Sequence, residues 1–325
     1  MLRAGEKTRR GFALLTVLGA VAVLSAVALA LATSVRTEIR AAQNRQDDLR
    51  AYYLAQAGIE EATYLLAYRG SAEISTARDL VSQIGGKELA FSLGEGRVRV
   101  EIRSEAGKID INQADEDLLA RLGQTIGLKP TEARQLSQAI IHWRSSRSDS
   151  TEDALDRYYR SLPQPYAARR GRFTTVEELL LVRGMTRDIL YGTFELTEDG
   201  DVVPRGGLID YVTVYNRSGL VDANSASYEV LRAIEISDWG SRSIVNARQI
   251  KPFATLADLQ VVVPAESAAS RLTVMAGDTL ELTATGEPTG SAVRHTIRAI
   301  IKLKSGTAPP CQVLAWYDQS PRWNQ

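Results

Sequence analysis

Four carboxylates cluster in a polar stretch near the middle of the chain: Asp149, Glu152, Asp153 and Asp156. Serine and threonine hydroxyls lie among them in the sequence. Ca²⁺ prefers about six to eight oxygen ligands, supplied by a flexible loop rich in acids. The four carboxylates are therefore a candidate calcium site, and a charged loop in solvent is the competing interpretation.

No other group of residues has the spacing of a catalytic or metal site. The chain has two histidines, His142 and His295, and one cysteine, Cys311, which excludes an intrachain disulfide. Nucleophile-elbow, zinc-protease and phosphate-loop motifs are absent. We therefore expect a protein that is not an enzyme and has no cofactor beyond the candidate calcium.

The bulk composition leaves room for two or three compact units in 325 residues. Lysine plus arginine equals aspartate plus glutamate, at 39 each, so no overall field attracts nucleic acid or an anionic surface. Nucleic acid is accordingly an unlikely partner on charge alone.

An uncharged apolar stretch runs from Phe12 to Val35, after a short leader that contains four basic residues. As a helix, Phe12–Ala32 is about 30 Å long, enough to cross a bilayer core. Three interpretations compete: a secretory signal cleaved near Ala32, a plain membrane anchor, and a helix that is kept after processing of the leader.

The junction Arg10-Gly11-Phe12-Ala13-Leu14-Leu15-Thr16-Val17-Leu18 resembles the leader junction of type IV pilins and type II secretion pseudopilins. The resemblance implies cleavage by prepilin peptidase between Gly11 and Phe12, and N-methylation of Phe12. Thr16 stands where pilins usually carry a glutamate, which can neutralise the terminal ammonium of the subunit above. A subunit with nothing above it does not need that carboxylate, so Thr16 fits a tip position, although it also fits an ordinary anchor.

A second resemblance follows the apolar stretch. Thr33–Tyr68 contains no proline and one glycine, which predicts that the helix continues beyond the membrane. Within it, Ala51-Tyr52-Tyr53-Leu54-Ala55-Gln56-Ala57-Gly58-Ile59-Glu60 resembles the signature of the general secretion pathway protein K family, the K-type minor pseudopilins. Family members bind calcium in their periplasmic body, which supports the candidate site, but their acidic run after the tryptophan is replaced here by basic residues after Trp143.

Alternating apolar and polar residues predict short strands at both ends of the soluble part. The expected strands are Glu88–Ser92, Arg97–Arg103, Thr279–Thr283, Val293–Leu303 and Gln312–Tyr317. With the long helix, they predict an α+β fold with a pilin-like antiparallel sheet that is interrupted by an insert.

The insert contains a degenerate repeat. Ile109–Ala114 matches Val221–Ala226, and Phe173–Leu179 matches Phe253–Leu259. We expect two all-helical units in which Asn112 and Asn224 cap the helices that follow them. The units resemble SAM-like or helix-hairpin-helix modules, and the K family carries such an insert.

Helix-hairpin-helix modules often bind DNA phosphates through a Gly-x-Gly hairpin. Leu181–Thr186 keeps one of these glycines, Gly184, and Ser237–Ser241 also lacks the pair. We therefore expect the units to serve in packing rather than in DNA binding.

The sequence thus predicts five segments: a leader at 1–11, the membrane part of the helix at 12–33, the rest of the helix and the first strands at 34–105, the insert at 106–265 with units at 106–205 and 206–265, and the last strands at 266–325. The resemblance implies a single-pass inner-membrane protein with a periplasmic body, at the tip of the type II secretion pseudopilus. Its implied partners are prepilin peptidase, the I- and J-type minor pseudopilins and the inner-membrane secretion platform. The alternatives are a minor pilin of a type IV pilus and a DNA-binding competence protein.

Overall fold

The computed structural model of the chain describes residues 6–68, 88–146, 153–196, 200–264, 270–275, 277–304 and 311–318. Side chains are described throughout these ranges except at 6–13, 68 and 195–196.

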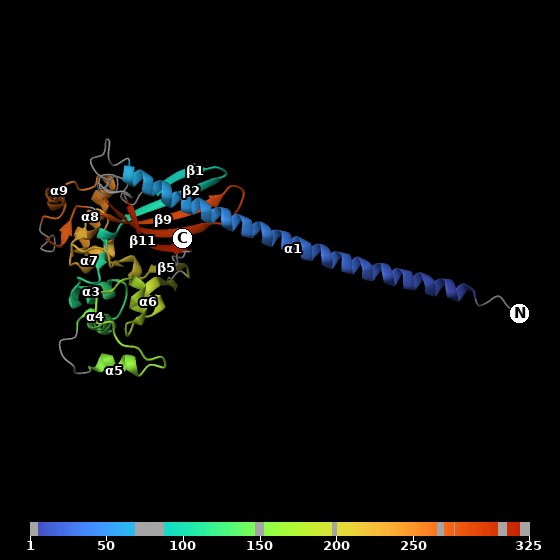
Figure 1. The fold of residues 1–325 in the computed structure, drawn as a ribbon, viewed down its shortest axis with the longest axis horizontal. Helices are drawn as coiled ribbons and strands as arrows, with labels where there is room; N and C mark the ends of the chain where they lie inside the picture. The colour runs from blue at the N-terminus through green and yellow to red at the C-terminus, as the bar shows by residue number, and fades with distance from the viewer. Residues whose placement is uncertain are drawn as a thin grey trace.

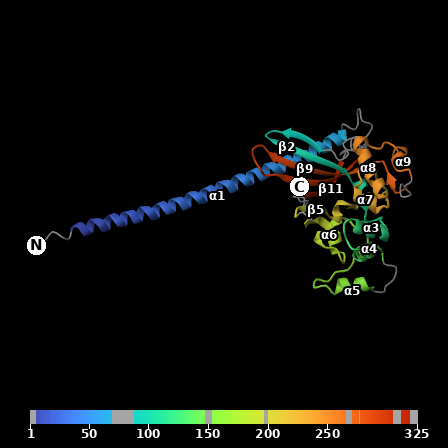
Figure 2. The ribbon, with the colours of Figure 1, turned by 180° about the vertical axis from the view of Figure 1, so that it is seen from behind.

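One helix, α1, runs without interruption from Glu6 to Tyr68, a length of 63 residues. At 1.5 Å per residue it is about 95 Å long. The body of the protein lies against its C-terminal part, and the N-terminal part extends away as a bare rod (Figures 1 and 2). This is the long helix that the sequence predicts, with the membrane part and the soluble part fused.

A five-stranded antiparallel sheet packs on the C-terminal part of α1. Its order is β1-β2-β9-β10-β11. The strands are β1 (Glu88–Leu93), β2 (Gly96–Ser104), β9 (Thr279–Pro288), β10 (His295–Leu303) and β11 (Cys311–Asp318). Because β2 pairs directly with β9, the sheet is continuous although the insert separates these strands in the sequence. The predicted fold class is confirmed.

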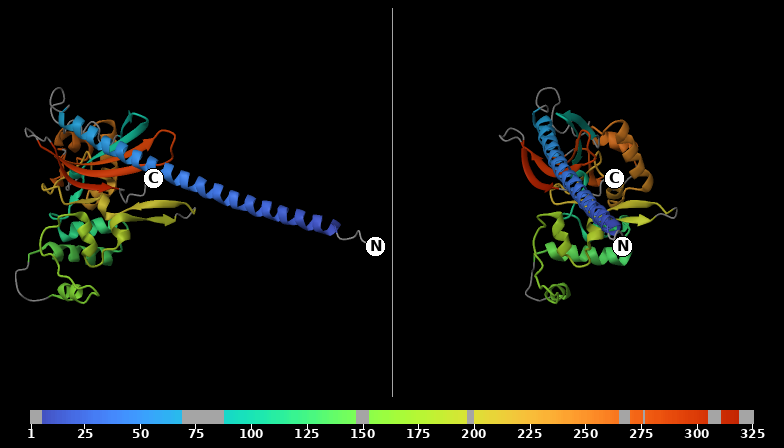
Figure 3. Two further views of the ribbon diagram at one scale, coloured as in Figure 1. Left: turned by 45° about the vertical axis from the view of Figure 1, so that its right-hand side comes forward. Right: turned by 90° about the vertical axis from the view of Figure 1, so that its right-hand side faces the viewer.

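The strands follow the alternation of the sequence. In β2, Val98, Val100 and Ile102 are buried, whereas Arg97 and Arg103 are exposed. The central strands β9 and β10 are buried over most of their length on both faces. Helix α1 crosses one face of the sheet, and the insert lies on the other side (Figure 3).

The insert lies between β2 and β9. Its first unit consists of η2 (Glu105–Gly107), β3 (Ile109–Asp110), α3 (Glu116–Thr125), α4 (Pro130–Arg144), α5 (Ala154–Arg160), η3 (Val176–Leu181), α6 (Arg187–Tyr191), β4 (Gly192–Leu196), β5 (Val202–Gly206), η4 (Leu208–Asp210) and β6 (Val212–Thr213). Its second unit consists of β7 (Val221–Asp222), α7 (Tyr228–Ala233), α8 (Asp238–Ile250), α9 (Leu256–Val262) and β8 (Leu272–Thr273).

The insert is mainly helical, but each unit also has a short parallel ladder that the sequence did not predict. β3 pairs with β6 in the first unit, and β7 pairs with β8 in the second. The first unit also has an antiparallel hairpin, β4–β5. Strands of two residues carry no recognisable alternation, which is why sequence patterns miss the ladders.

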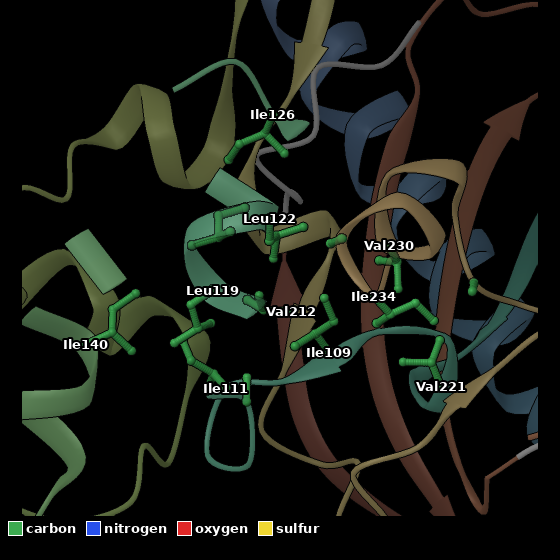
Figure 4. Packing of buried hydrophobic residues seen from close by; sticks show 14 of the residues in the cluster. Ile109, Ile111, Leu119, Leu122, Ile126, Ile140, Val212, Val221, Val230 and Ile234 are labelled. Carbon is green, nitrogen blue, oxygen red and sulfur yellow. The ribbon is translucent and has the colours of Figure 1, made fainter. Parts of the chain in front are cut away.

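The two units share one hydrophobic core. Figure 4 shows Ile109, Leu119 and Leu122 of the first unit converging with Val221 and Val230 of the second. A separate core forms where α1 meets the sheet. The described part of the body therefore has two cores, one for each layer of the fold.

Candidate assembly helix and the insert beside it

The N-terminal part of α1 is apolar and uncovered. Leu14, Leu18, Leu24 and Leu31 are each at least 64% exposed, and none of the 18-residue membrane-length window is buried by the body. Among the helices that the structure describes, α1 is the one long and apolar enough to cross a membrane. An apolar surface of this size needs a partner, either lipid or other apolar helices.

The predicted processing site lies at the start of this helix. Gly11 and Phe12 have helical backbone within α1, and their side chains are outside the described set. Cleavage between them and methylation of Phe12 remain predictions. Thr16, at the position of the usual pilin glutamate, lies on the exposed surface of the same helix.

The C-terminal part of α1 packs closely on the sheet because the facing residues are small. Ala51, Ala55 and Ala62 are fully buried. A Cβ atom at Gly286 of β9 would lie 2.2 Å from the carbonyl oxygen of Ala51, and one at Gly58 of α1 would lie 2.5 Å from Val98. Glycine is thus required at both contacts, and the body is held firmly to the helix.

The tyrosine pair of the family signature sits at this interface. The ring of Tyr52 is half-buried and makes an edge contact with the His295 ring at 5.3 Å, whereas Tyr53 is 59% exposed. His295 is itself buried between two carboxylates, with Nδ1 3.2 Å from Asp48 of α1 and Nε2 2.5 Å from Asp318 of β11. The signature therefore marks where the helix is tied to the sheet.

Two of the four predicted calcium ligands lie in the described part of the chain. Asp153 and Asp156 are brought together with His142, and the three potential ligand atoms lie within 4.8 Å of one another. Asp149 and Glu152 lie outside the described residues. Sequence reasoning did not assign His142 or Arg170 to this site. The guanidinium Nη2 of Arg170 is 2.7 Å from Asp156 Oδ2 and 3.3 Å from Asp153 Oδ2.

Asp153 also begins helix α5. Its Oδ1 atom accepts the backbone N–H groups of Leu155 and Asp156, each at 2.9 Å. Burial alone would raise the pKa of Asp153, but the Asp156 N–H, His142 and Arg170 lower that pKa to about 2. The carboxylate is therefore ionised at any physiological pH.

The repeated Asp-x-Asn sequences hold each unit together by the same hydrogen bonds. Asn112 Oδ1 accepts the backbone N–H of Phe173 at 2.8 Å, and its Nδ2 donates to the Phe173 carbonyl at 3.1 Å. Asn224 makes the same pair with Phe253, at 2.8 and 3.0 Å. The prediction that these asparagines cap the next helices is wrong, because Asp115 caps α3 and Ser227 caps α7.

An arginine completes each of these hydrogen-bonded groups. Arg144 donates to the carbonyls of Ile111 and Ala114, and Arg248 donates to the equivalent carbonyls of Ala223 and Ala226. Burial lowers the pKa of both arginines, and the neighbouring aspartate in each unit opposes that effect. The duplication seen in the sequence is thus preserved down to single hydrogen bonds.

Comparison with known proteins finds a family match that covers most of the first unit. Residues 99–191 match the family model described as type II secretion system (T2SS), protein K. Over these residues, the chain is similar to the type II secretion protein K family. The family resemblance predicted from the sequence is confirmed.

The fold is also similar to a solved structure, the GspK–GspI–GspJ complex of the type 2 secretion system of enterotoxigenic Escherichia coli. The match covers 88% of this chain and 99% of that chain, with a TM-score of 0.54 and 13% identity. At that identity the likeness supports the fold. No curated protein matches the sequence.

The matched region runs from β2 to α6, so it includes the junction between the sheet and the insert. There, Lys108 Nζ lies 2.6 Å from Glu105 Oε1 and 2.8 Å from Glu281 Oε2 of β9. Arg298 of β10 lies 3.5 Å from Glu281 and 3.6 Å from Glu177 of η3. This network was missed from sequence because Lys108, Glu281 and Glu177 are far apart along the chain.

The hairpin that would contact DNA in a helix-hairpin-helix module is occupied by internal hydrogen bonds. The Arg183 N–H donates to the Tyr159 hydroxyl at 3.1 Å, and the Met185 N–H donates to the Val182 carbonyl at 3.1 Å. In the second unit, the Gly240 N–H donates to Ser237 Oγ at 3.0 Å. Backbone donors that are already satisfied have little to offer a phosphate.

Proposed function

We propose that the chain is a non-enzymatic tip subunit of the type II secretion pseudopilus. In this role it assembles with other minor pseudopilins to initiate and cap the filament that exports proteins across the outer membrane. It is a single-pass inner-membrane protein with its body in the periplasm. Its partners are the I- and J-type pseudopilins, prepilin peptidase and the inner-membrane platform.

One observation carries the proposal: the body covers only the C-terminal part of α1 and leaves the apolar part bare (Figure 1). That bare part can sit first in lipid and later in a bundle of similar helices. The insert widens the body well beyond the helix and sheet (Figure 3). A head of this width is accommodated at the end of a filament, whereas stacking it along the shaft would produce clashes.

Thr16 is consistent with an end position. In a bundle of apolar helices, the ammonium group of a processed terminus needs a carboxylate partner, because an unpaired buried charge is costly. A tip subunit has no subunit above it and can do without the glutamate. The hydroxyl of Thr16 supplies no such charge.

The processing step is tested by mass spectrometry of the N-terminus of the membrane-extracted protein. We expect a mature chain that begins at Phe12 and carries one methyl group. A chain that begins at Thr33, or that keeps Met1–Gly11 in cells with active prepilin peptidase, contradicts the proposal.

Assembly is tested by cross-linking in cells that express the I- and J-type pseudopilins. Leu24→Arg places a charge in the bare apolar part of α1 and should abolish both membrane insertion and cross-links, because a central charge costs about 3 kcal/mol. Leu24→Ile is the matched control and should cross-link like the wild type. Thr16→Glu should also retain cross-links, whereas loss of assembly in that variant would argue against the tip position.

The filament type is decided by the same experiment, since cross-links to type IV pilus subunits instead would favour the minor-pilin alternative. A gel shift of the detergent-solubilised chain with DNA tests the competence-protein alternative. Phosphate-driven binding would weaken steeply as salt is raised. We expect no shift at either low or moderate salt.

A further inference from the structure

Asp153 and Asp156, at the start of α5, are both paired with the guanidinium of Arg170. Arg170 Nη2 donates to Asp156 Oδ2 at 2.7 Å and to Asp153 Oδ2 at 3.3 Å. The Arg170 side chain is 21% exposed and that of Asp156 is 10% exposed, so the interaction is largely shielded from solvent. A guanidinium–carboxylate pair in such a place is among the stronger polar interactions in proteins.

His142 joins this group from the end of α4. Its Nε2 atom lies 2.7 Å from Asp153 Oδ2 and 2.7 Å from Arg170 Nη2. Arg170 Nη1 also donates to the His142 carbonyl at 3.4 Å. Three separate parts of the chain meet here: the end of α4, the start of α5 and the loop that contains Arg170.

The backbone conformation of Arg170 is a second observation that bears on the position of its side chain. Arg170 has φ +55°, in the left-handed region that side chains other than glycine seldom adopt. The conformation is strained for a residue that carries a side chain. It persists because it directs the guanidinium to the two carboxylates.

The described part of the predicted calcium site does not fit calcium while Arg170 is in place. Ca²⁺ needs about six to eight oxygen ligands. Both oxygens of Asp153 are engaged, Oδ1 by two backbone N–H groups and Oδ2 by His142 and Arg170. A divalent ion beside these carboxylates would also lie against the guanidinium, where like charges repel.

We propose that Arg170 is a built-in cation that takes the place of a divalent metal at Asp153 and Asp156, so that the α4–α5 part of the insert folds without calcium. The guanidinium neutralises the carboxylates and joins the three segments that a bound ion would otherwise join. This inference is independent of the proposed place in the filament, because it concerns the folding of the insert alone.

The test measures thermal unfolding of the full chain in detergent, first in EDTA and then in excess CaCl₂. For the wild type we expect the same Tm in both conditions and no calcium binding by titration calorimetry. Arg170→Gly removes the guanidinium and at the same time relieves the positive φ. We expect its Tm in EDTA to fall by several degrees, and CaCl₂ to restore part of that loss.

Two variants act as controls. Arg157→Ala removes an exposed positive charge from the same helix as Asp156 and should leave both the Tm and its calcium response unchanged. Arg170→Lys keeps the charge without the planar fork and should lie between the wild type and Arg170→Gly.

The proposal is overturned by any of three results. The first is a wild-type Tm that falls in EDTA and recovers in CaCl₂. This result is obtained from the wild type alone. The second is an equal calcium response of the wild type and Arg170→Gly. The third is an Arg170→Gly chain as stable in EDTA as the wild type.

Discussion

Lys108 and Glu281 form a buried ion pair at 2.8 Å although they are 173 residues apart in the sequence. Lys108 follows η2 at the start of the insert, and Glu281 lies in the central strand β9, fully buried. The pair joins the two layers of the fold at the point where the chain leaves the sheet. The insert is therefore fixed to the pilin-like body rather than suspended from it by a linker.

Lys108→Met tests this junction. The substitution leaves Glu105 and Glu281 buried without their shared cation, so we expect a loss of about 3–5 kcal/mol in the free energy of unfolding. Denaturant unfolding of the full chain in detergent measures it. Lys302→Met is the control, because the Lys302–Asp278 pair is exposed and should contribute less than about 1 kcal/mol. Equal losses in the two variants would show that the junction is not held by this pair.

The repeated asparagine contacts predict paired effects. Asn112→Ala and Asn224→Ala each remove two hydrogen bonds to a phenylalanine backbone, at 2.8 and 3.1 Å in the first unit and 2.8 and 3.0 Å in the second. Each should cost about 2–3 kcal/mol in unfolding free energy, because buried backbone groups lose their partners.

Gln113→Ala is the control for the two asparagine variants. Gln113 is exposed and occupies the position next to Asn112. Gln113→Ala should change the unfolding free energy by less than about 0.5 kcal/mol. If one asparagine variant were as stable as Gln113→Ala, the two units would not be held in the same way.

The close approach of α1 to β9 predicts that Gly286 tolerates no side chain. A Cβ atom there would lie 2.2 Å from the Ala51 carbonyl oxygen and 2.7 Å from the Ala55 nitrogen. Gly286→Ala should destabilise the chain by about 1–3 kcal/mol, since backbone must move to admit the methyl group. Gly171→Ala, which meets only one atom at 3.9 Å, should be close to neutral. Thermal unfolding of both variants checks the difference.

Local patterns predicted the fold well because its main elements are encoded locally. The uncharged run after Phe12 and the lack of proline up to Tyr68 specify α1, and the alternation in Arg97–Arg103 specifies β2 within one residue at each end. The repeat was visible because both copies keep Asp and Asn at the same spacing.

The contacts that tie the elements together were not predictable in the same way. The partner of Lys108 lies on β9, and the partner of Asp156 is Arg170, which lies in the loop between α5 and η3. The asparagine positions show how long-range contacts prevail over local ones: Asn112 stands where a helix cap is expected, but its amide binds the backbone of Phe173, 61 residues away. Cap propensity alone contains no information about that partner.

His295 predicts a pH dependence of stability. Burial alone would lower the pKa of His295, but Asp318 and Asp48 more than compensate, and the pKa in the folded chain is raised above 6.5. The other group against the ring is Tyr52 of α1. The stabilisation is fully present below the unfolded pKa and is lost as pH rises through the folded pKa. Unfolding free energy should therefore fall as the pH rises above about 6.5, by a step that is absent in His295→Gln. If the unfolding free energies of the wild type and His295→Gln changed with pH in the same way, a charged His295 between α1 and β11 would be contradicted.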